Sequence, residues 1–151
     1  MTNVSLADAE ALAQWRTKRY GEKYQLPTEE QWEYAARNGA QHTNYPWGDQ
    51  LLSDRANIDS NSLKPVGSYP QGASRLGIVD LIGNAWEWTS SKASVYPGNA
   101  KLAAPQGQVI RGGAYNEASS GPDAITATRR SFVAPSMKDS TIGFRLVRVG
   151  S

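Results

Sequence analysis

The spacing of apolar positions predicts two helices near the start of the chain. Over residues 5–20, leucine and alanine side chains recur at intervals of three and four, and Ser5 stands before them as a cap. Over residues 28–38 the signal is stronger, because Thr28 and Gln31 form a capping box ahead of an apolar face. We therefore expect one helix over each range.

Short strands are predicted in the second half of the chain. Residues 142–149 give the clearest strand pattern, 108–111 a second one, and the alternation over 125–130 indicates a third candidate. Prolines and glycines break any periodicity over 40–77, and 90–108 also reads as a loop. Two helices followed by short strands and long loops are typical of an α+β domain, here with a small antiparallel sheet and most residues outside regular structure.

The stretch between residues 76 and 89 places two carboxylates around a turn. Asp80 interrupts an apolar run, a Gly83-Asn84 pair follows, and Glu87 then stands between two tryptophans. A carboxylate buried alone is costly, and a calcium ion held by carboxylates and turn carbonyls would offset that cost. In the alternative interpretation Asp80 caps a turn and Glu87 pairs with an arginine.

Composition narrows the possible functions. The chain has 151 residues, a size that suits one domain, and a net charge of +2, which indicates neither a nucleic-acid nor a membrane partner. It has no cysteine, so thiolate metal sites and thiol nucleophiles are excluded. The sequence shows no signal segment and no transmembrane run, which favours the cytoplasm. Its only histidine, His42, lies in a polar stretch and is expected on the surface.

Seven motifs in order resemble those of the formylglycine-generating enzyme, or sulfatase-modifying factor, family. They read VSLADAEALAQW, LPTEEQWEYAAR, YPWGD, PVGSYP, GIVDLIGNAWEWT, VIRGGAY and ATRRSFVAPSMKDSTIGFRLVR. The resemblance covers residues 3–149 and implies a C-type-lectin-like fold. The family's usual N-terminal portion is absent, and we expect a single domain over 1–151.

The family's catalytic metal is not implied for this chain. The catalysts hold copper on two cysteines that follow an Arg-Gly-Gly-Ser motif, and by resemblance these positions fall on Glu117 and Pro122. Proline has no ligating side chain, and a carboxylate is a poor ligand for copper(I). We therefore expect no copper and no enzymatic activity.

The family's calcium site carries over residue by residue. Its ligands correspond to the side chains of Asp80 and Glu87 and to the backbone carbonyls of Gly83 and Ala85. The resemblance therefore implies structural calcium at the place that the charge pattern indicated. A second family site would need Asn57, but the loop after it is shorter than usual in the family, so that site stays open.

The resemblance leaves three functions open. The first is a non-catalytic module that binds a peptide or protein ligand, and the resemblance implies a fused or neighbouring kinase domain as one partner. The second is a variable ligand-binding protein of a diversity-generating retroelement, although residues 114–141 contain one asparagine and therefore look fixed. The third is the C-terminal half of a formylglycine-generating or sulfoxide-synthase-like oxidase.

For the binding module, the segment after the double glycine is the expected ligand surface, because function concentrates on loops held by a rigid scaffold. The candidate ligand-binding residues are Tyr115, Asn116, Glu117, Arg130 and Trp86. Tyr115 would serve as a rigid anchor and Arg130 would hold a carboxylate of the partner.

Overall fold

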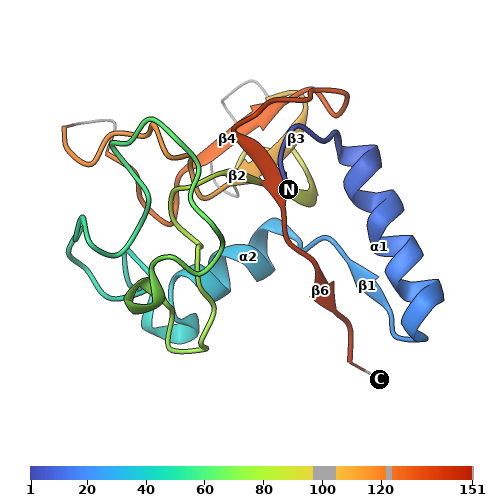
Figure 1. The fold of residues 1–151 in the computed structure, drawn as a ribbon, viewed down its shortest axis with the longest axis horizontal. Helices are drawn as coiled ribbons and strands as arrows, with labels where there is room; N and C mark the ends of the chain where they lie inside the picture. The colour runs from blue at the N-terminus through green and yellow to red at the C-terminus, as the bar shows by residue number, and fades with distance from the viewer. Residues whose placement is uncertain (97–104, 122–123, 151) are drawn as a thin grey trace.

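A computed structural model describes residues 1–96, 105–121 and 124–150 of the chain (Figure 1). The elements are, in order, α1 (Leu6–Tyr20), β1 (Tyr24–Gln25), α2 (Glu29–Ala36), the 3-10 turns η1 (Gly39–Gln41) and η2 (Pro70–Gly72), β2 (Trp86–Lys92), β3 (Gln108–Arg111), β4 (Arg130–Val133), β5 (Ile142–Phe144) and β6 (Val147–Arg148). Helices and strands cover fewer than half of the described residues, and the α+β class is confirmed.

Local capping explains where both helices begin. The hydroxyl of Ser5 accepts the amide of Asp8 at the start of α1, and the Asp8 side chain accepts the amide of Ser5 in return. Thr28 and Gln31 form the same reciprocal pair at the start of α2. The two predicted helices are therefore confirmed. Neither has the length and apolarity that crossing a membrane would require.

The main sheet has four strands in the order β4-β3-β2-β5, and it is mixed. Strands β2, β3 and β4 pair antiparallel, but β5 lies parallel to β2, with Glu87 opposite Gly143. The prediction of a purely antiparallel sheet is wrong at this pair. A parallel neighbour needs a crossover connection rather than a hairpin, and a strand's own residue pattern does not report its direction.

Three strand boundaries also differ from the predictions. The 142–149 segment divides into β5 and β6, and β6 joins β1 in a separate two-stranded sheet. The candidate strand at 125–130 begins only at Arg130. Strand β2 extends to Lys92, into the predicted 90–108 loop, whose residues 97–104 lie outside the described part of the chain.

The core contains two clusters of buried side chains. One joins Trp32 of α2 to Leu81 and Ile125, and the other joins Trp88 of β2 to Ile110 of β3. Helix α1 and the β1–β6 pair lie at one side of the molecule, while the long loops between α2 and β2 lie at the opposite side (Figure 1). The predicted site residues of the 80–87 stretch therefore stand where the loops meet β2.

Candidate functional site

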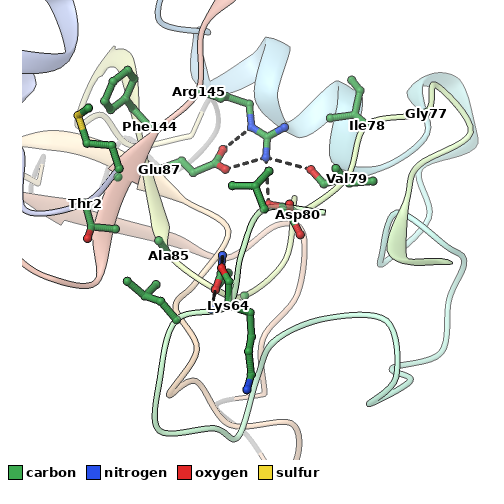
Figure 2. A pocket seen from close by; sticks show the side chains of 16 residues that line it. Thr2, Lys64, Gly77, Ile78, Val79, Asp80, Ala85, Glu87, Phe144 and Arg145 are labelled. Atoms are coloured by element: carbon green, nitrogen blue, oxygen red, sulfur yellow. Dashed lines mark hydrogen bonds and ion pairs between the residues drawn. The ribbon is translucent and has the colours of Figure 1, made fainter. Parts of the chain in front are cut away.

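The four predicted calcium residues line one cleft. This cleft of about 550 Å³ is bordered by Asp80, Gly83, Ala85 and Glu87, and also by Arg145 (Figure 2). The turn at Gly83 leads directly into β2, which carries Glu87 on its second residue. The structure thus brings the predicted residues together and adds Arg145, which was not predicted there.

Glu87 is held by three hydrogen bonds from cationic or indole donors. Arg145 Nε donates to its Oε2 at 2.6 Å and Nη2 to its Oε1 at 2.7 Å, while Trp32 Nε1 donates to Oε2 at 2.7 Å. The Glu87 residue is 9% exposed. Such a bidentate, charge-assisted pair is among the stronger polar contacts in proteins.

The surroundings of Arg145 favour its charged form. Burial acts to lower the pKa of Arg145, but the charge and hydrogen bonds of Glu87 and the charge of Asp80 outweigh burial and raise that pKa above its usual value. The same guanidinium donates from Nη2 to the carbonyl oxygens of Val79 and Asp80 at 3.2 and 2.9 Å. Arg145 therefore fixes the backbone of the turn as well as the Glu87 carboxylate.

Asp80 adopts a left-handed backbone conformation, with a φ of 56°, and one of its oxygens closes a neighbouring turn. Gly67 N donates to Asp80 Oδ2 at 2.7 Å. The turn role of Asp80 and the arginine partner of Glu87 are thus both present, as the alternative interpretation of this stretch expected. Calcium binding stays a prediction.

Only part of the donor set is open to a hard cation. Within the described residues Asp80 Oδ1 has no hydrogen-bond partner, and carboxylate and carbonyl oxygens are the ligands that calcium prefers. The Gly83 carbonyl, however, already accepts Ala85 N at 2.9 Å, and the cations Lys64 and Arg145 also line the cleft. No group of three or more histidine, cysteine or acidic side chains gathers anywhere in the described residues. A cation at this cleft would therefore depend on carbonyls and water, and it would share Glu87 with Arg145.

Asn84 connects the cleft to the preceding loop. Its Oδ1 accepts hydrogen bonds from Asn57 Nδ2 and from Lys64 N, both at 2.9 Å. Asn57 is 3% exposed, and its own Oδ1 accepts the Ser60 hydroxyl at 2.7 Å. The side chain that a second calcium site would need is thus already used within the loop.

The predicted ligand segment is tied to the same loops through its backbone. Tyr115 N donates to the Asn84 carbonyl at 3.0 Å, and the Tyr115 carbonyl accepts Ser60 N at 2.9 Å. The Glu117 carbonyl accepts Asp59 N at 3.0 Å. Asn116 is exposed and Tyr115 is half-buried, so the segment presents side chains from a fixed backbone.

Trp86 and Glu117, two of the predicted ligand-binding residues, contact each other. Trp86 Nε1 donates to Glu117 Oε1 at 3.1 Å, and Arg129 Nη1 lies 2.9 Å from Glu117 Oε2. Trp86 itself is only 8% exposed and packs in the core. Of the two positions that correspond to copper cysteines, Glu117 is therefore committed to internal contacts, and Pro122 lies outside the described residues.

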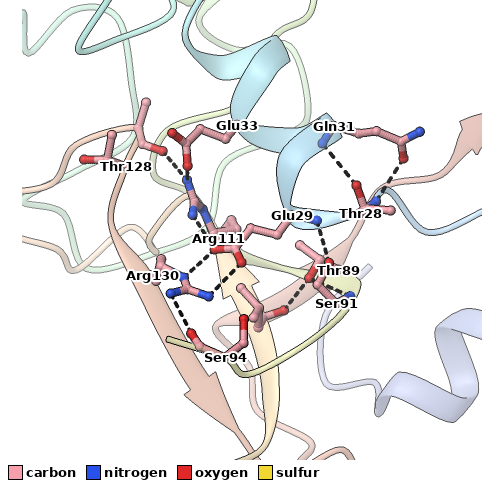
Figure 3. A network of polar contacts seen from close by, with 12 residues as sticks. Thr28, Glu29, Gln31, Glu33, Thr89, Ser91, Ser94, Arg111, Thr128 and Arg130 are labelled. Carbon is pink, nitrogen blue, oxygen red and sulfur yellow. Dashed lines mark hydrogen bonds and ion pairs between the residues drawn. The ribbon is translucent and has the colours of Figure 1, made fainter. Parts of the chain in front are cut away.

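Arg130 belongs to a different network (Figure 3). Its Nε and Nη2 donate to the two oxygens of Glu29 at 2.5 and 2.8 Å, and Nη1 donates to the Ser94 carbonyl at 3.0 Å. Arg111, fully buried, also donates to Glu29 Oε1 at 2.6 Å. Among the described contacts none joins Arg130 to Tyr115 or Asn116, so the structure does not bring it to the ligand segment.

Arg129 and Arg145 are site residues that were not predicted from the sequence. Arg129 reaches Glu117 while its neighbour Arg130 reaches Glu29, as expected where successive side chains point to opposite sides at the start of β4. The Arg129-Arg130 pair could have indicated this, since two successive residues of a strand point to opposite sides and only one of them can face the ligand segment. Arg145 follows directly after the last residue of β5, which pairs with the strand that holds Glu87.

Comparison with known proteins identifies the class. The fold is that of formylglycine-generating-enzyme-like and C-type-lectin-like domains, as shown by PvdO from Pseudomonas aeruginosa (TM-score 0.75, 25% identity, 97% of this chain and 60% of that one). Treponema denticola variable protein 1 shares the fold at a TM-score of 0.76 and 20% identity, over 97% of this chain and 69% of that one.

The chain belongs to the family described as sulfatase-modifying factor enzyme 1-like domains, whose model matches residues 1–149. Inactive C-alpha-formylglycine-generating enzyme 2 of Bos taurus is 33% identical over 96% of this chain and 48% of its own length. Formylglycine-generating enzyme of Streptomyces coelicolor is 35% identical over 96% and 51%. Serine/threonine-protein kinase Pkn1 of Chlamydia trachomatis is 32% identical over 98% and 24%.

The chain thus spans about half the length of its formylglycine-generating relatives, at 48% and 51%, and a smaller share of the kinase. Both a protein called inactive and a protein called an enzyme are similar to it. Membership of the family therefore does not tell whether this chain is a catalyst, and that has to be argued from its site residues.

Proposed function

We propose that this domain is a non-catalytic binding module, stabilised by calcium, that presents residues 115–119 to a peptide or protein ligand. One observation carries the proposal. Glu117, which by resemblance stands at a copper-cysteine position, is held by the Trp86 indole and by Arg129 instead of being open to a metal. The absence of cysteine from the chain removes the thiolates that copper(I) would need.

The fixed backbone of the segment supports a binding role. Hydrogen bonds to Asp59, Ser60 and Asn84 hold the main chain of Tyr115 and Glu117 in place before any partner arrives. A surface ordered in advance loses less conformational entropy on binding, so more of the contact energy appears as affinity. The proposed surface centres on Tyr115 and Asn116, with Arg129 rather than Arg130 beside it.

The kinase relative supports an attached role for such a domain. Pkn1 contains a region similar to almost this entire chain within a protein about four times as long, since the match covers 24% of it. We infer that this domain recruits a peptide or protein to a neighbouring catalytic domain, as a separate binding unit.

Binding is tested by panning a displayed peptide library against the domain. Peptides selected on the natural protein should lose affinity by about tenfold or more in Tyr115→Ala and in Asn116→Ala, as expected for central interface residues. Asn44→Ala is the matched control, because Asn44 is also exposed and its loop is bonded to Ala127 rather than to residues 115–119. Selected peptides that bind all of these variants alike would place the ligand surface elsewhere.

The lack of catalysis is tested separately. The protein, loaded with copper(I) in air, is incubated with a cysteine-containing sulfatase peptide, and the peptide mass is followed. We expect no aldehyde above the control without protein, while an active relative produces it. Aldehyde formed by this chain would overturn the non-catalytic assignment but leave the binding result standing.

A variable ligand-binding protein of a retroelement is the second candidate. This candidate is supported by the fold that the chain shares with Treponema denticola variable protein 1. The two sequences are 20% identical, so this likeness shows a common fold and not a common function. Residues 114–141 contain only one asparagine, whereas adenine-directed diversification should enrich such codons. A reverse transcriptase gene beside this one, with a partial repeat of the segment, would favour this candidate over an attached domain.

A further inference from the structure

The outer side of α1 exposes large rings next to the β1–β6 pair. Trp15 is 55% exposed and Tyr20 is 57% exposed, both high values for aromatic residues. Tyr20 contacts Trp15 and Tyr24 edge-on, with ring centroids 6.4 Å apart in both cases. We call the surface formed by Trp15, Arg16, Arg19, Tyr20 and Tyr24 the α1 aromatic face.

Arg16 is held on this face by rings instead of by a carboxylate. Its guanidinium carbon lies 4.8 Å from the Tyr24 ring centroid and 5.5 Å from that of Tyr20. Its Nε is buried and has no hydrogen-bond partner within the described residues. In that part of the chain neither Arg16 nor Arg19 forms an ion pair, whereas Arg111 and Arg145 each bind a glutamate.

The indole N–H of Trp15 also lacks an acceptor in the part of the chain that the structure describes. Four of the five tryptophans donate their indole N–H to a protein acceptor, namely Trp32 to Glu87, Trp47 to the Gln50 carbonyl, Trp86 to Glu117 and Trp88 to the Val4 carbonyl. No acceptor among the described residues meets the Trp15 N–H. An exposed ring with a free donor beside two cations without ion pairs suits an incoming acceptor.

The charge around this face is strongly biased. Residues 15–25 contain four lysines and arginines and a single acid, Glu22. Arg148 Nη1 donates to Glu22 at 2.8 Å and the Tyr24 hydroxyl donates to it at 3.0 Å, so this acid is already neutralised. Residues 15–25 thus carry a net charge of +3, four cations less one acid, whereas the whole chain carries only +2. The complementary partner is acidic.

We propose that the α1 aromatic face binds an acidic polypeptide segment that carries an apolar side chain. The apolar side chain packs on Trp15 and Tyr20, while carboxylates of the segment accept hydrogen bonds from Arg19, Arg16 and the Trp15 indole. A nucleic acid fits less well, because stacked bases need open ring faces and the Arg16 guanidinium already lies over two of these rings. A bilayer fits less well, since a helix that lies on a membrane separates an apolar face from its cationic face, whereas here Arg16 lies over the exposed rings themselves.

This surface is separate from the proposed ligand segment. Helix α1 lies at the opposite side of the molecule from the long loops of the 40–77 stretch, to which residues 115–119 are tied (Figure 1). The two surfaces can therefore be occupied together, and the proposal does not depend on the function assigned to the loops.

The test uses a short synthetic peptide of alternating glutamate and leucine, with a lysine-and-leucine peptide as its charge-reversed control. Indole N–H signals in a nitrogen-15 correlation spectrum report the site, and Trp15→Phe identifies the Trp15 signal. We expect the acidic peptide to shift this signal and to leave those of Trp32 and Trp88 unmoved. The lysine peptide should shift none of them.

Matched variants then separate a specific surface from general charge. Arg19→Glu should weaken peptide binding by about tenfold or more, whereas Arg75→Glu, an equal charge change on an exposed loop, should not. Tyr20→Ala should weaken binding and Tyr34→Ala, a ring of similar exposure (60%) on α2, should not. Thermal unfolding of each variant confirms that it remains folded.

Three outcomes would overturn the proposal. The first is a Trp15 signal that the acidic peptide leaves unchanged. The second is equal weakening by Arg19→Glu and Arg75→Glu, which would indicate attraction by net charge alone. The third is a Trp15 shift caused by single-stranded polyadenylate or by phosphatidylserine vesicles but not by the peptide, which would assign the face to a nucleic acid or to a membrane.

Discussion

Replacement of Glu87 by glutamine removes one charge from the partly buried pair with Arg145 and keeps the side-chain shape. The Glu87 and Arg145 side chains are 11% and 24% exposed, so solvent screens the pair only in part. Removing one partner of a buried pair costs about 3–5 kcal/mol. Because Arg145 keeps its bonds to the Val79 and Asp80 carbonyls, we expect the lower end, about 3 kcal/mol, for Glu87→Gln.

This loss is large for a domain whose total stability is of order 5–15 kcal/mol. With a urea dependence of about 2–3 kcal/mol per molar, it should lower the unfolding midpoint by about 1–1.5 M. Tryptophan fluorescence follows the transition, and a chelator in the buffer isolates the ion pair from any metal. Trp32 still has an acceptor in the glutamine carbonyl, so that contact is retained.

The double variant Glu87→Gln with Arg145→Met identifies the cause. If the cost comes from the stranded guanidinium, the double variant should lose less stability than the sum of the two single changes. Glu22→Gln, which breaks the exposed pair with Arg148, is the control and should move the midpoint little. A Glu87→Gln midpoint no lower than that of Glu22→Gln would refute the stabilising role assigned to this pair.

Two further predictions concern calcium and acid. Calcium should raise the melting temperature of the natural domain relative to chelator, by about 2.7 kcal/mol of stability at a hundredfold excess over Kd, and Asp80→Ala should abolish the rise; equal midpoints for the natural domain would remove the calcium site. The pKa of Asp8 is lowered from 3.8 to about 2, mainly by a hydrogen bond from Lys138 and to a smaller extent by hydrogen bonds from Ser5. The ionised Asp8 carboxylate therefore contributes stability that is present above pH 4 and is lost as the pH falls toward 2. A carboxyl titration by NMR checks this, and an Asp8 pKa near 3.8 in the folded protein would contradict it.

Local signals predicted the elements that depend on neighbouring residues. Thr28 and Gln31 are three residues apart, and their capping box placed the start of α2 correctly. The run at 108–111 gave β3 with its observed bounds. The parallel direction of β5 was not predictable in this way, because it depends on where the chain returns after β4 and not on the residues of β5 themselves.

The ion-pair partners of the charged side chains were harder to predict from the sequence than the helices and strands. Asp80 and Glu87 were correctly expected near each other, but the cation facing Glu87 comes from Arg145, 58 residues later in the chain. Arg130 was predicted beside the ligand segment, but Arg129 is the arginine that contacts Glu117, while Arg130 contacts Glu29. Neighbouring residues of a strand point to opposite faces, so an error of one residue places a side chain on the wrong face. Ala114, the first residue of the segment after the double glycine that was expected to form the ligand surface, is 1% exposed, because the segment leaves the core only after it.

The hydrogen bonds that hold Tyr115 in place run through its main-chain atoms, which every amino acid but proline supplies in full. Tyr115 and Asn116 can therefore be exchanged for many other residues while the loop keeps its course, whereas Asn84 contributes its own side chain and cannot be exchanged so freely. The segment is thus a natural place for a combinatorial library. Variation confined to its side chains would change what the domain recognises while the scaffold beneath stays the same.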